Sequence, residues 1–394
     1  MMYIQNLQKI RQITFHFWPN KLINLTLSLV IAALLFSANA YAEKPVAGDP
    51  QTDVFDGLWD SAVLYGSKSG ERFPFIKARG RYHGQVFKFD GDGDAATDSE
   101  SRRIRLGLDV AFTDKLELSF DFNMGRQSGD DFIENFDFIS LSYAIDDNTE
   151  LSVGKLRRNA LTREDSTSSN NILTIERSLL ASRFFMDNVG GAYIEHEKDA
   201  WTFGGGILKG STEEDLRLPS LDGATMFQAN IANQITDITE IRLDYLHNPG
   251  DPNNNDVEPY RHVISLNSST RSGRWGLITD VIYAAGLPEA RGDLFGIVIM
   301  PHYMLTQRLQ LVGRYTWSGS NEANGIRLLN RYDRRAVPEG FEFGDRHQEI
   351  YAGLNYYFYG HKLKVMSGVS YTDFDSVEGN TSVVTASAAL RFYF

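Results

Sequence analysis

A basic, hydroxyl-rich segment between Lys155 and Arg183 has the side chains that bind small anions. It holds more cations than acids, and Ser168 and Ser169 add hydroxyl donors. The cations are Lys155, Arg157, Arg158, Arg163, Arg177 and Arg183. Because the arginine guanidinium is a planar fork of donors that matches phosphate and carboxylate groups, this composition predicts an anion-binding segment. Its expected contact residues are Lys155, Arg157, Arg158, Arg163, Ser168 and Ser169.

A second set of cations recurs at every second position along two stretches of chain. Lys77, Arg79 and Arg81 alternate with small or apolar residues, and Arg103 and Arg105 do the same further on. Together with Arg242 and Arg314, they are predicted to line a water-filled lumen as a ladder for anions. The alternative is that these cations only solvate a wide interior and pair with acids such as Asp121 and Asp244.

The sequence carries no recognisable catalytic or metal-binding motif, so we expect no catalytic residues, no cofactor and no metal. It has no cysteine, which excludes disulfides and thiolate sites. It has no G-x-S-x-G or H-E-x-x-H pattern, and the acidic stretch Asp90–Glu100 fails the EF-hand template. A net charge of -12 argues against a nucleic-acid partner, which needs a basic footprint.

The N-terminus predicts export. Residues 22–36 form an apolar run that follows Lys21 and precedes Ala40-Tyr41-Ala42, a small-residue cleavage pattern. We therefore expect residues 1–42 to be a cleaved signal peptide, with the mature chain starting near Glu43. The alternative is an uncleaved anchor, for which the run is short, since a spanning helix needs about 20 apolar residues.

The mature chain alternates apolar and polar residues, which is the period of a β-strand. Leu106, Leu108 and Val110 are separated by Gly107 and Asp109, and similar runs recur down the chain. Many runs reach roughly ten residues, the length that a tilted membrane-spanning strand requires. This favours a transmembrane β-barrel over the alternative, a soluble periplasmic or secreted β protein.

The connections between these runs alternate in length. Short ones, such as Thr113–Lys115, are followed by longer polar ones, and our division gives about sixteen strands. The longer connections are predicted at 90–101, 126–131, 157–187, 210–222, 248–260, 287–293, 319–346 and 374–380. Short periplasmic turns and long extracellular loops on an even-stranded antiparallel barrel are typical of the bacterial outer membrane. We therefore predict an all-β barrel over 73–394, after a periplasmic extension at 43–72.

The chain ends on an apolar strand with no polar tail. Its last residues alternate, so that Leu390, Phe392 and Phe394 share a face predicted to meet lipid and Arg391 points inward. Phe392 and Phe394 resemble the C-terminal assembly signal of outer-membrane barrels, which the barrel-assembly machinery recognises. The expected surroundings are therefore outer-membrane lipid and lipopolysaccharide, and the rings would belong to an aromatic girdle.

Several stretches resemble the phosphate-selective porin O and P family. The similar stretches are FPFIKARGRYHGQVFKF (73–89), RRIRLGLDVAFTDKLELSFDFN (102–123), VGKLRR (153–158) and TSSNNILTIERSLLASRF (167–184). The resemblance implies a homotrimeric pore of about sixteen strands for small anions, with phosphate as the leading candidate. It also implies that the loop 157–187 folds inward and constricts the channel. The alternatives are a general or cation-preferring diffusion porin, and, further away, an outer-membrane barrel enzyme or a purely structural barrel.

Overall fold

The computed structural model describes residues 50–66, 75–126, 129–156, 161–184, 189–209, 225–249, 260–286 and 292–394. The predicted signal peptide, Arg157 and Arg158 lie outside these ranges, as do residues 43–49 and 67–74 of the predicted extension. None of the helices in the described ranges has the length and apolar character needed to cross a membrane.

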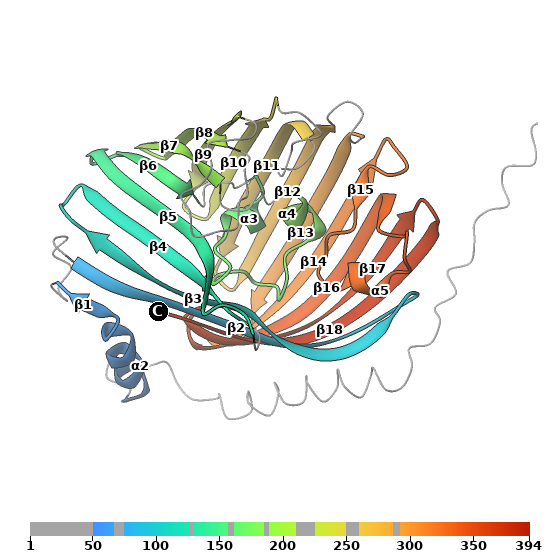
Figure 1. The fold of residues 1–394 in the computed structure, drawn as a ribbon, viewed down its shortest axis with the longest axis horizontal. Coiled ribbons are helices and arrows are strands. Elements are labelled where there is room, and N and C mark those ends of the chain that lie inside the picture. The colour runs from blue at the N-terminus through green and yellow to red at the C-terminus, as the bar shows by residue number, and fades with distance from the viewer. Residues whose placement is uncertain are drawn as a thin grey trace, which may run out of the picture. The chain divides into compact units, whose positions relative to one another are not determined.

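Sixteen long antiparallel strands form a closed barrel (Figure 1). Each strand pairs with its neighbours in the sequence, and β18 pairs with β2 to close the sheet. The strands are β2 (Phe75–Gly91), β3 (Ala95–Ala111), β4 (Leu116–Met124), β5 (Ile133–Asp146), β6 (Thr149–Leu156), β7 (Val189–Lys198), β8 (Trp201–Lys209), β9 (Thr225–Thr236), β10 (Thr239–His247), β11 (Tyr260–Ser272), β12 (Trp275–Gly286), β13 (Leu294–Met304), β14 (Leu309–Ser320), β16 (Phe343–Tyr359), β17 (Leu363–Ser376) and β18 (Gly379–Tyr393). This confirms the predicted fold class. A closed sheet satisfies its backbone hydrogen bonds without leaving an edge, which hydrocarbon demands.

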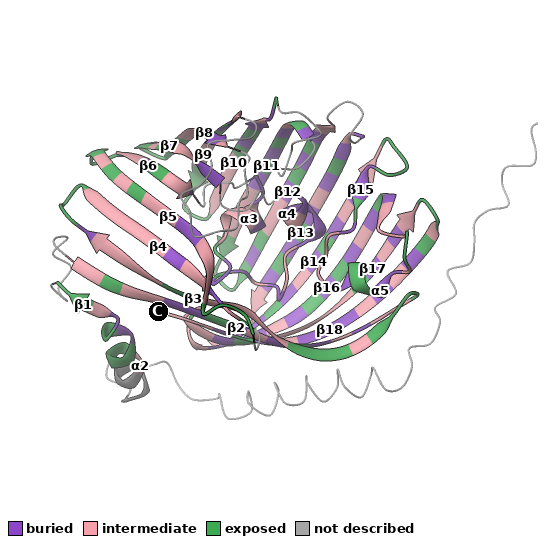
Figure 2. Ribbon diagram, in the orientation of Figure 1, coloured by how far each residue is buried: buried purple, intermediate pink, exposed green. Residues whose placement is uncertain are grey.

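The two faces of the strands differ in exposure, as the alternating sequence predicts. Buried and exposed positions alternate along β11, β12 and β13 (Figure 2). Large apolar side chains such as Leu266, Val281 and Leu311 are exposed on the outside, whereas polar side chains such as Asn267 and Asp280 are buried inside. An apolar outer face and a polar interior are the reverse of a water-soluble core, and they fit a barrel surrounded by lipid.

The connections at one end of the barrel are tight turns of two to four residues. They lie at 112–115, 147–148, 199–200, 237–238, 273–274, 305–308 and 360–362. At the other end, two connections predicted to be long are also tight, because β3 already begins at Ala95 and β18 at Gly379. The stretch 90–101 is therefore mostly strand. β2 and β3 have 17 residues each, about 56 Å at ~3.3 Å per residue, so they extend beyond the ~30 Å hydrocarbon layer, where both faces can be polar.

The described part of the N-terminal extension packs beside the last strand. It contains helix α2 (Pro50–Asp60) and the short strand β1 (Val63–Tyr65), which pairs with β2. Trp59 Nε1 donates a hydrogen bond to the Tyr393 carbonyl oxygen over 2.6 Å, and its ring lies 5.4 Å from that of Phe392 and 5.0 Å from that of Tyr359. The extension therefore contacts the end of the barrel that carries the tight turns.

Two connecting segments pack against the inner face of the barrel. The first, residues 161–184, contains α3 (Arg163–Ser166) and α4 (Leu179–Arg183), which lie within the ring of strands in Figure 1. The second, residues 321–342, contains the short strand β15 (Ile326–Arg327) and α5 (Asp333–Ala336). Their buried apolar residues join inward-facing wall residues in one core cluster.

The position of the second segment corrects the expectation of an external loop at 319–346. Ile326, Leu328 and Tyr332 are buried against wall residues that include Phe87 and Phe89. The Tyr332 ring stacks on Phe87 with 4.2 Å between centroids. The physical reason is that Phe87 and Phe89 are large apolar side chains on the inner face, and this segment removes them from water.

Candidate functional site

The site begins with arginines placed opposite one another on β2 and β3. In the antiparallel register, Arg81 faces Arg105 and His83 faces Arg103. The register shifts between His83 and Gly84, so Arg102 is an extra residue on β3. Such a bulge re-aims side chains, and here Arg102 reaches the inner segment, with its Nε 3.1 Å from Glu176 Oε1.

Like charges in directly opposed positions destabilise a sheet, so this arrangement needs partners. Arg81 Nη1 donates to Ser169 Oγ over 2.8 Å, and Arg105 Nε donates to Asn123 Oδ1 over 2.8 Å and also pairs with Asp137. The guanidinium of Arg103 lies in the field of Glu176 but forms no hydrogen bond or ion pair with the residues that the structure describes. Its guanidinium is thus available to a mobile anion.

These arginines line a cavity of about 700 Å³ between the β2–β5 wall and the segment 161–184. Hydroxyls from Ser166 to Ser169 border it on the segment side. Eight arginines line it against four acids, which leaves it with an excess of positive charge. The arginines are Arg81, Arg102, Arg103, Arg105, Arg126, Arg177, Arg331 and Arg334, and the acids are Glu134, Asp137, Asp165 and Glu176.

The two acids of the segment 161–184 that reach the cavity differ in their pKa. Burial by itself raises the pKa of Glu176, but Arg102, Arg103 and Arg391 oppose this and lower it to about 2. Burial raises the pKa of Asp165 to about 7, and Arg177 opposes the rise only in part. Glu176 therefore carries a fixed charge, whereas the charge of Asp165 changes near neutral pH.

Carbonyl oxygens of the segment 161–184 accept hydrogen bonds from the wall formed by β14, β16, β17 and β18. Lys364 Nζ donates to the Ile172 oxygen over 2.7 Å and Asn355 Nδ2 to the Leu173 oxygen over 2.8 Å. Arg391 and Arg314 donate to the oxygens of residues 175 and 176 over 2.7 and 3.0 Å. Four inward side chains from β14, β16, β17 and β18 thus satisfy carbonyl groups that would otherwise be buried without partners.

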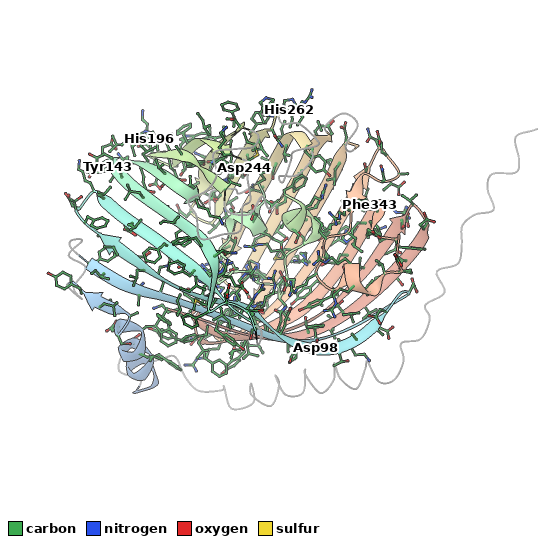
Figure 3. The ribbon with its side chains drawn as sticks, in the orientation of Figure 1. Asp98, Tyr143, His196, Asp244, His262 and Phe343 are labelled. Atoms are coloured by element: carbon green, nitrogen blue, oxygen red, sulfur yellow. The ribbon has the colours of Figure 1, made fainter. Side chains whose placement is uncertain are left out.

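Arg314 anchors the segment 161–184 and does not line the cavity of about 700 Å³ beside it. Its guanidinium pairs with Glu164 over 2.7 Å and with Glu349 over 2.6 Å, and its side chain is almost fully buried. Arg242 also differs from a free lumen cation, because it pairs with Asp244 over 2.6 Å. Asp244 lies inside the barrel, whereas Tyr143, His196 and His262 project from its periphery (Figure 3).

The other predicted residues fall in separate places. Lys77 and Arg79 line a smaller cavity of about 280 Å³, where Arg79 pairs with Asp109 over 2.7 Å. Arg163 pairs with Glu240 of β10, away from the cavity-lining arginines. Lys155 shares a face of β6 with the exposed Val153, and its Nζ donates to the Phe136 oxygen over 2.9 Å, so it does not line the large cavity.

The structure thus brings together Arg81, Arg103, Arg105, Ser168 and Ser169 of the predicted site residues. Sequence reasoning did not assign Arg102, Arg126, Arg331 or Arg334 to the site. The bulge brings Arg102 to the cavity, and the inward course of residues 321–342 brings Arg331 and Arg334 there. The Arg102-Arg103 pair and the Arg334-Arg335 pair were the only local signals, and neither shows where its side chains go.

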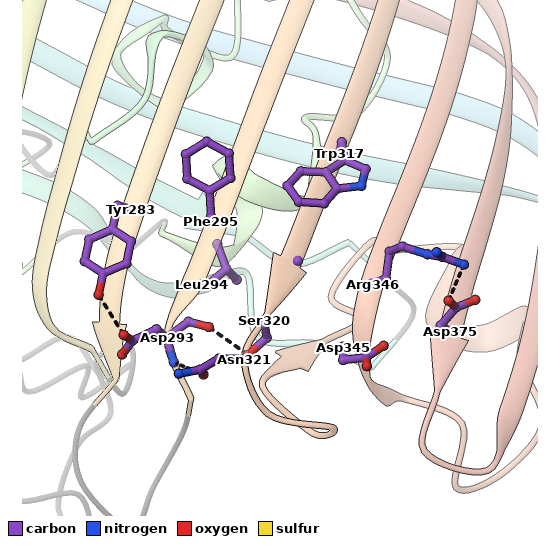
Figure 4. Close-up of a pocket in the computed structure, with 11 residues that line it drawn as sticks. Tyr283, Asp293, Leu294, Phe295, Trp317, Ser320, Asn321, Asp345, Arg346 and Asp375 are labelled. Atoms are coloured by element: carbon purple, nitrogen blue, oxygen red, sulfur yellow. Dashed lines mark hydrogen bonds and ion pairs between the residues drawn. The ribbon is translucent and has the colours of Figure 1, made fainter. Parts of the chain in front are cut away.

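A cavity on the outside of the barrel has the opposite charge. Tyr283, Phe295 and Trp317 line it, and its volume is about 590 Å³ (Figure 4). Its only cation among the lining residues is Arg346, which pairs with Asp375, whereas Asp293 and Asp345 add further acids. The positive charge is therefore a property of the interior cavity and is not shared by this outer one.

The C-terminal residue completes the closure of the barrel. Phe394 exchanges backbone hydrogen bonds with Gly80, with distances of 3.0 and 3.1 Å. A Cβ at position 80 would lie 2.3 Å from the Phe394 ring, so a larger residue there would displace this ring.

The closed sixteen-stranded barrel with a polar interior and an apolar outer face defines an outer-membrane channel of the porin type. Residues 76–270 match the sequence pattern of the phosphate-selective porin O and P family. This confirms the resemblance seen in the sequence. No curated protein matches the chain.

Several solved structures share the fold. The outer membrane channel DcaP of Acinetobacter baumannii is 12% identical, with 84% of this chain and 99% of that chain covered and a TM-score of 0.54. Salmonella typhi OmpF in complex with daunomycin is 12% identical, with 84% and 100% covered and a TM-score of 0.55. A trimer form of Vibrio cholerae OmpT is 11% identical, with 81% and 99% covered and a TM-score of 0.52. At these identities the likeness establishes the fold alone.

Proposed function

We propose that this channel passes small anions, with phosphate as the leading candidate, and that the segment 161–184 forms its constriction. The observation that carries the proposal is the cavity beside that segment, which eight arginines and four acids line. The match of residues 76–270 to the family pattern supports a channel, and the name of that family supports phosphate.

The net charge of -12 does not oppose this proposal. Charges farther away than about 8 Å are largely screened at physiological salt, so the groups at the narrowest point decide which ion passes. The side chains of Arg81 and Arg103 line the same cavity as the hydroxyls of Ser168 and Ser169, and Arg81 Nη1 donates to Ser169 Oγ. An anion passing there exchanges part of its hydration for charge-assisted hydrogen bonds.

Phosphate fits this lining because it accepts several hydrogen bonds at once from forked donors and hydroxyls. Other inorganic anions and small organic acids offer similar acceptors. Arg157 and Arg158, which lie outside the described residues, remain part of the proposed constriction.

Reversal potentials under a salt gradient test the proposal, and Arg103→Gln is the informative variant. It removes one positive charge without leaving a described acid unpaired. We expect the wild-type channel to favour chloride over potassium and to be blocked by phosphate, and we expect the variant to lose part of both properties. Arg346→Gln, which changes an ion pair at the outer cavity, is the matched control and should behave as wild type. A cation-selective wild-type channel would favour the alternative, a general or cation-preferring diffusion porin.

We also propose that the protein is a channel and not an enzyme, and that it works as a homotrimer in contact with lipopolysaccharide. The trimer form of the similar OmpT structure supports the assembly. Phe392 and Phe394 are the proposed signal to the assembly machinery, and residues 1–42 are the proposed cleaved leader. Heat-modifiable migration of the purified trimer and N-terminal sequencing that starts near Glu43 test these points.

A further inference from the structure

Three potential metal ligands meet where the segment 321–342 touches the wall. His347 and Glu349 point inward from β16, because residues two apart in a strand share a face. Asp333 approaches them from α5, and one ligand atom from each residue lies within 4.8 Å of the others. All three side chains are buried, and His347 is fully buried.

His347 has no hydrogen-bond partner among the described residues at either ring nitrogen. Its register neighbour Ser318 and the nearby Thr316, both on β14, also have buried hydroxyls without partners there. Leaving a buried polar group unpaired destabilises the folded state, so such groups usually mark a bound water or ion. Four such atoms in one place point to an occupant.

The charges around this point also call for a cation. Glu164 and Glu349 share the single guanidinium of Arg314, and Asp333 is the third acid. Asp333 Oδ2 accepts only the neutral donors Thr372 Oγ1, over 2.7 Å, and Asn330 Nδ2, over 3.1 Å. Buried carboxylates need a compensating charge, and Asp333 has no ion pair among the described residues, although Arg177 and Arg331 line the same small pocket.

We propose that Asp333, His347 and Glu349 bind one divalent transition-metal ion, of which Zn²⁺ is the representative, and that this ion fastens the segment 321–342 to β16. Imidazole with carboxylate ligands suits zinc better than magnesium or calcium, which prefer oxygen ligands alone. Tetrahedral ligation at metal–ligand distances of about 2.1 Å places ligand atoms about 3.4 Å apart, so these atoms, which now lie within 4.8 Å of one another, approach by at most about 1.4 Å to close the site. Each carboxylate keeps lone pairs free beside its present hydrogen bonds. The inference is independent of the selectivity of the channel.

The test is a Zn²⁺ titration of the purified, folded channel in detergent, by calorimetry after treatment with EDTA. A second pair of histidines could bind zinc elsewhere, since His247 and His262 lie side by side on β10 and β11 with ring centroids 4.8 Å apart. All proteins in the titration therefore carry His262→Ala. We expect one zinc ion per chain, and at least a tenfold loss of affinity with His347→Ala. His302→Ala, which removes another buried inward histidine, should bind as the parent does.

Hydrogen exchange supplies a readout that does not depend on calorimetry. Zn²⁺ should slow exchange in residues 321–342 of the parent protein and leave it unchanged in the His347→Ala and Asp333→Asn variants. Asp333→Asn keeps the side-chain volume and serves if His347→Ala fails to migrate as a folded, heat-modifiable barrel. Unchanged zinc affinity in both variants, or the absence of saturable zinc binding in the parent, overturns the proposal and leaves ordered water as the occupant.

Discussion

The two segments inside the barrel are attached to the wall in different ways. The segment 161–184 presents a row of main-chain carbonyl oxygens that accept from the wall side chains Lys364, Asn355, Arg391 and Arg314. Ion pairs of its own side chains, such as Arg163 with Glu240, add to this attachment. The segment 321–342 is held by the pairing of β15 with β16 and by its own side chains, because Arg331 and Tyr332 bond to Glu100 and Asp333 bonds to Thr372.

This difference decides which side chains remain for solutes. Main-chain attachment leaves Asp165, Ser168 and Ser169 of the first segment facing the cavity. In the second segment, the side chain of Arg331 reaches the cavity while it is paired with Glu100, and the side chain of Arg334 lines the cavity as well. The first segment is therefore suited to selecting ions, and the second to narrowing the space around the first.

The largest effect should follow from Arg314→Leu, which removes the anchor shared by Glu164, Glu349 and the carbonyl oxygen of residue 176. Breaking a buried pair by deleting one partner costs about 3–5 kcal/mol, because the remaining carboxylates stay buried without a counter-charge. We expect the segment 161–184 to leave the wall, so that single-channel conductance rises and ion selectivity falls. Planar bilayer recordings measure both, and Arg346→Leu serves as the control. Wild-type conductance in a folded Arg314→Leu barrel would show that the anchor does not hold the constriction.

A smaller effect is expected from Arg331→Ala, which removes a side-chain attachment of the segment 321–342. The ion pair with Glu100 is partly exposed, so solvent screening limits its contribution to stability. Hydrogen exchange should speed up in residues 321–342 and stay unchanged in 161–184, and the anion/cation permeability ratio should fall modestly because one cavity charge is lost. Equal acceleration in both segments would mean that they are a single cooperative unit.

Asp165 makes the selectivity of the first segment depend on pH. Its pKa is raised to about 7, so the carboxyl is mostly neutral at pH 6 and mostly charged at pH 8. The cavity is more positive at the lower pH, and the anion/cation permeability ratio should therefore fall as pH rises from 6 to 8. In Asp165→Asn the ratio should stay near the low-pH value throughout, because Glu176, with its pKa of about 2, does not titrate in this range. The same fall in the variant would assign the titration to another group.

Tyr332→Phe should have the smallest effect. It removes the hydroxyl that donates to Glu100 Oε1 over 2.8 Å and also contacts Gln85, but it keeps the ring stacked on Phe87. A net loss of about 1 kcal/mol is expected for such a hydrogen bond. Slightly faster exchange near residues 328–337, with normal conductance, is the expected result. A large rise in conductance would mean that this hydroxyl, and not apolar packing, keeps the segment inside.

The sequence by itself determined the barrel, because the period-two pattern assigns each residue to a face whatever it later contacts. Alternating short and long connections then indicated the order of the hairpins, and the terminal Phe394 indicated where the last strand ends. The sequence also indicated two sets of anion-binding groups, namely the basic segment that contains Ser168 and Ser169 and the inward-facing Arg81 and Arg105, but it did not indicate that Arg81 contacts Ser169.

Only the tertiary structure decided which inward side chains face a solute and which hold a segment. Four basic side chains point into the barrel but have different roles. Arg103 lines the cavity, whereas Arg314, Lys364 and Arg391 donate to carbonyl oxygens of the segment 161–184. The bulge that aims Arg102 inward and the fold of residues 321–342 onto Phe87 likewise depend on partners far away in the chain. A local pattern sets the face of a strand, but the register across strands and the course of a loop are set by contacts between distant residues, which no local pattern records.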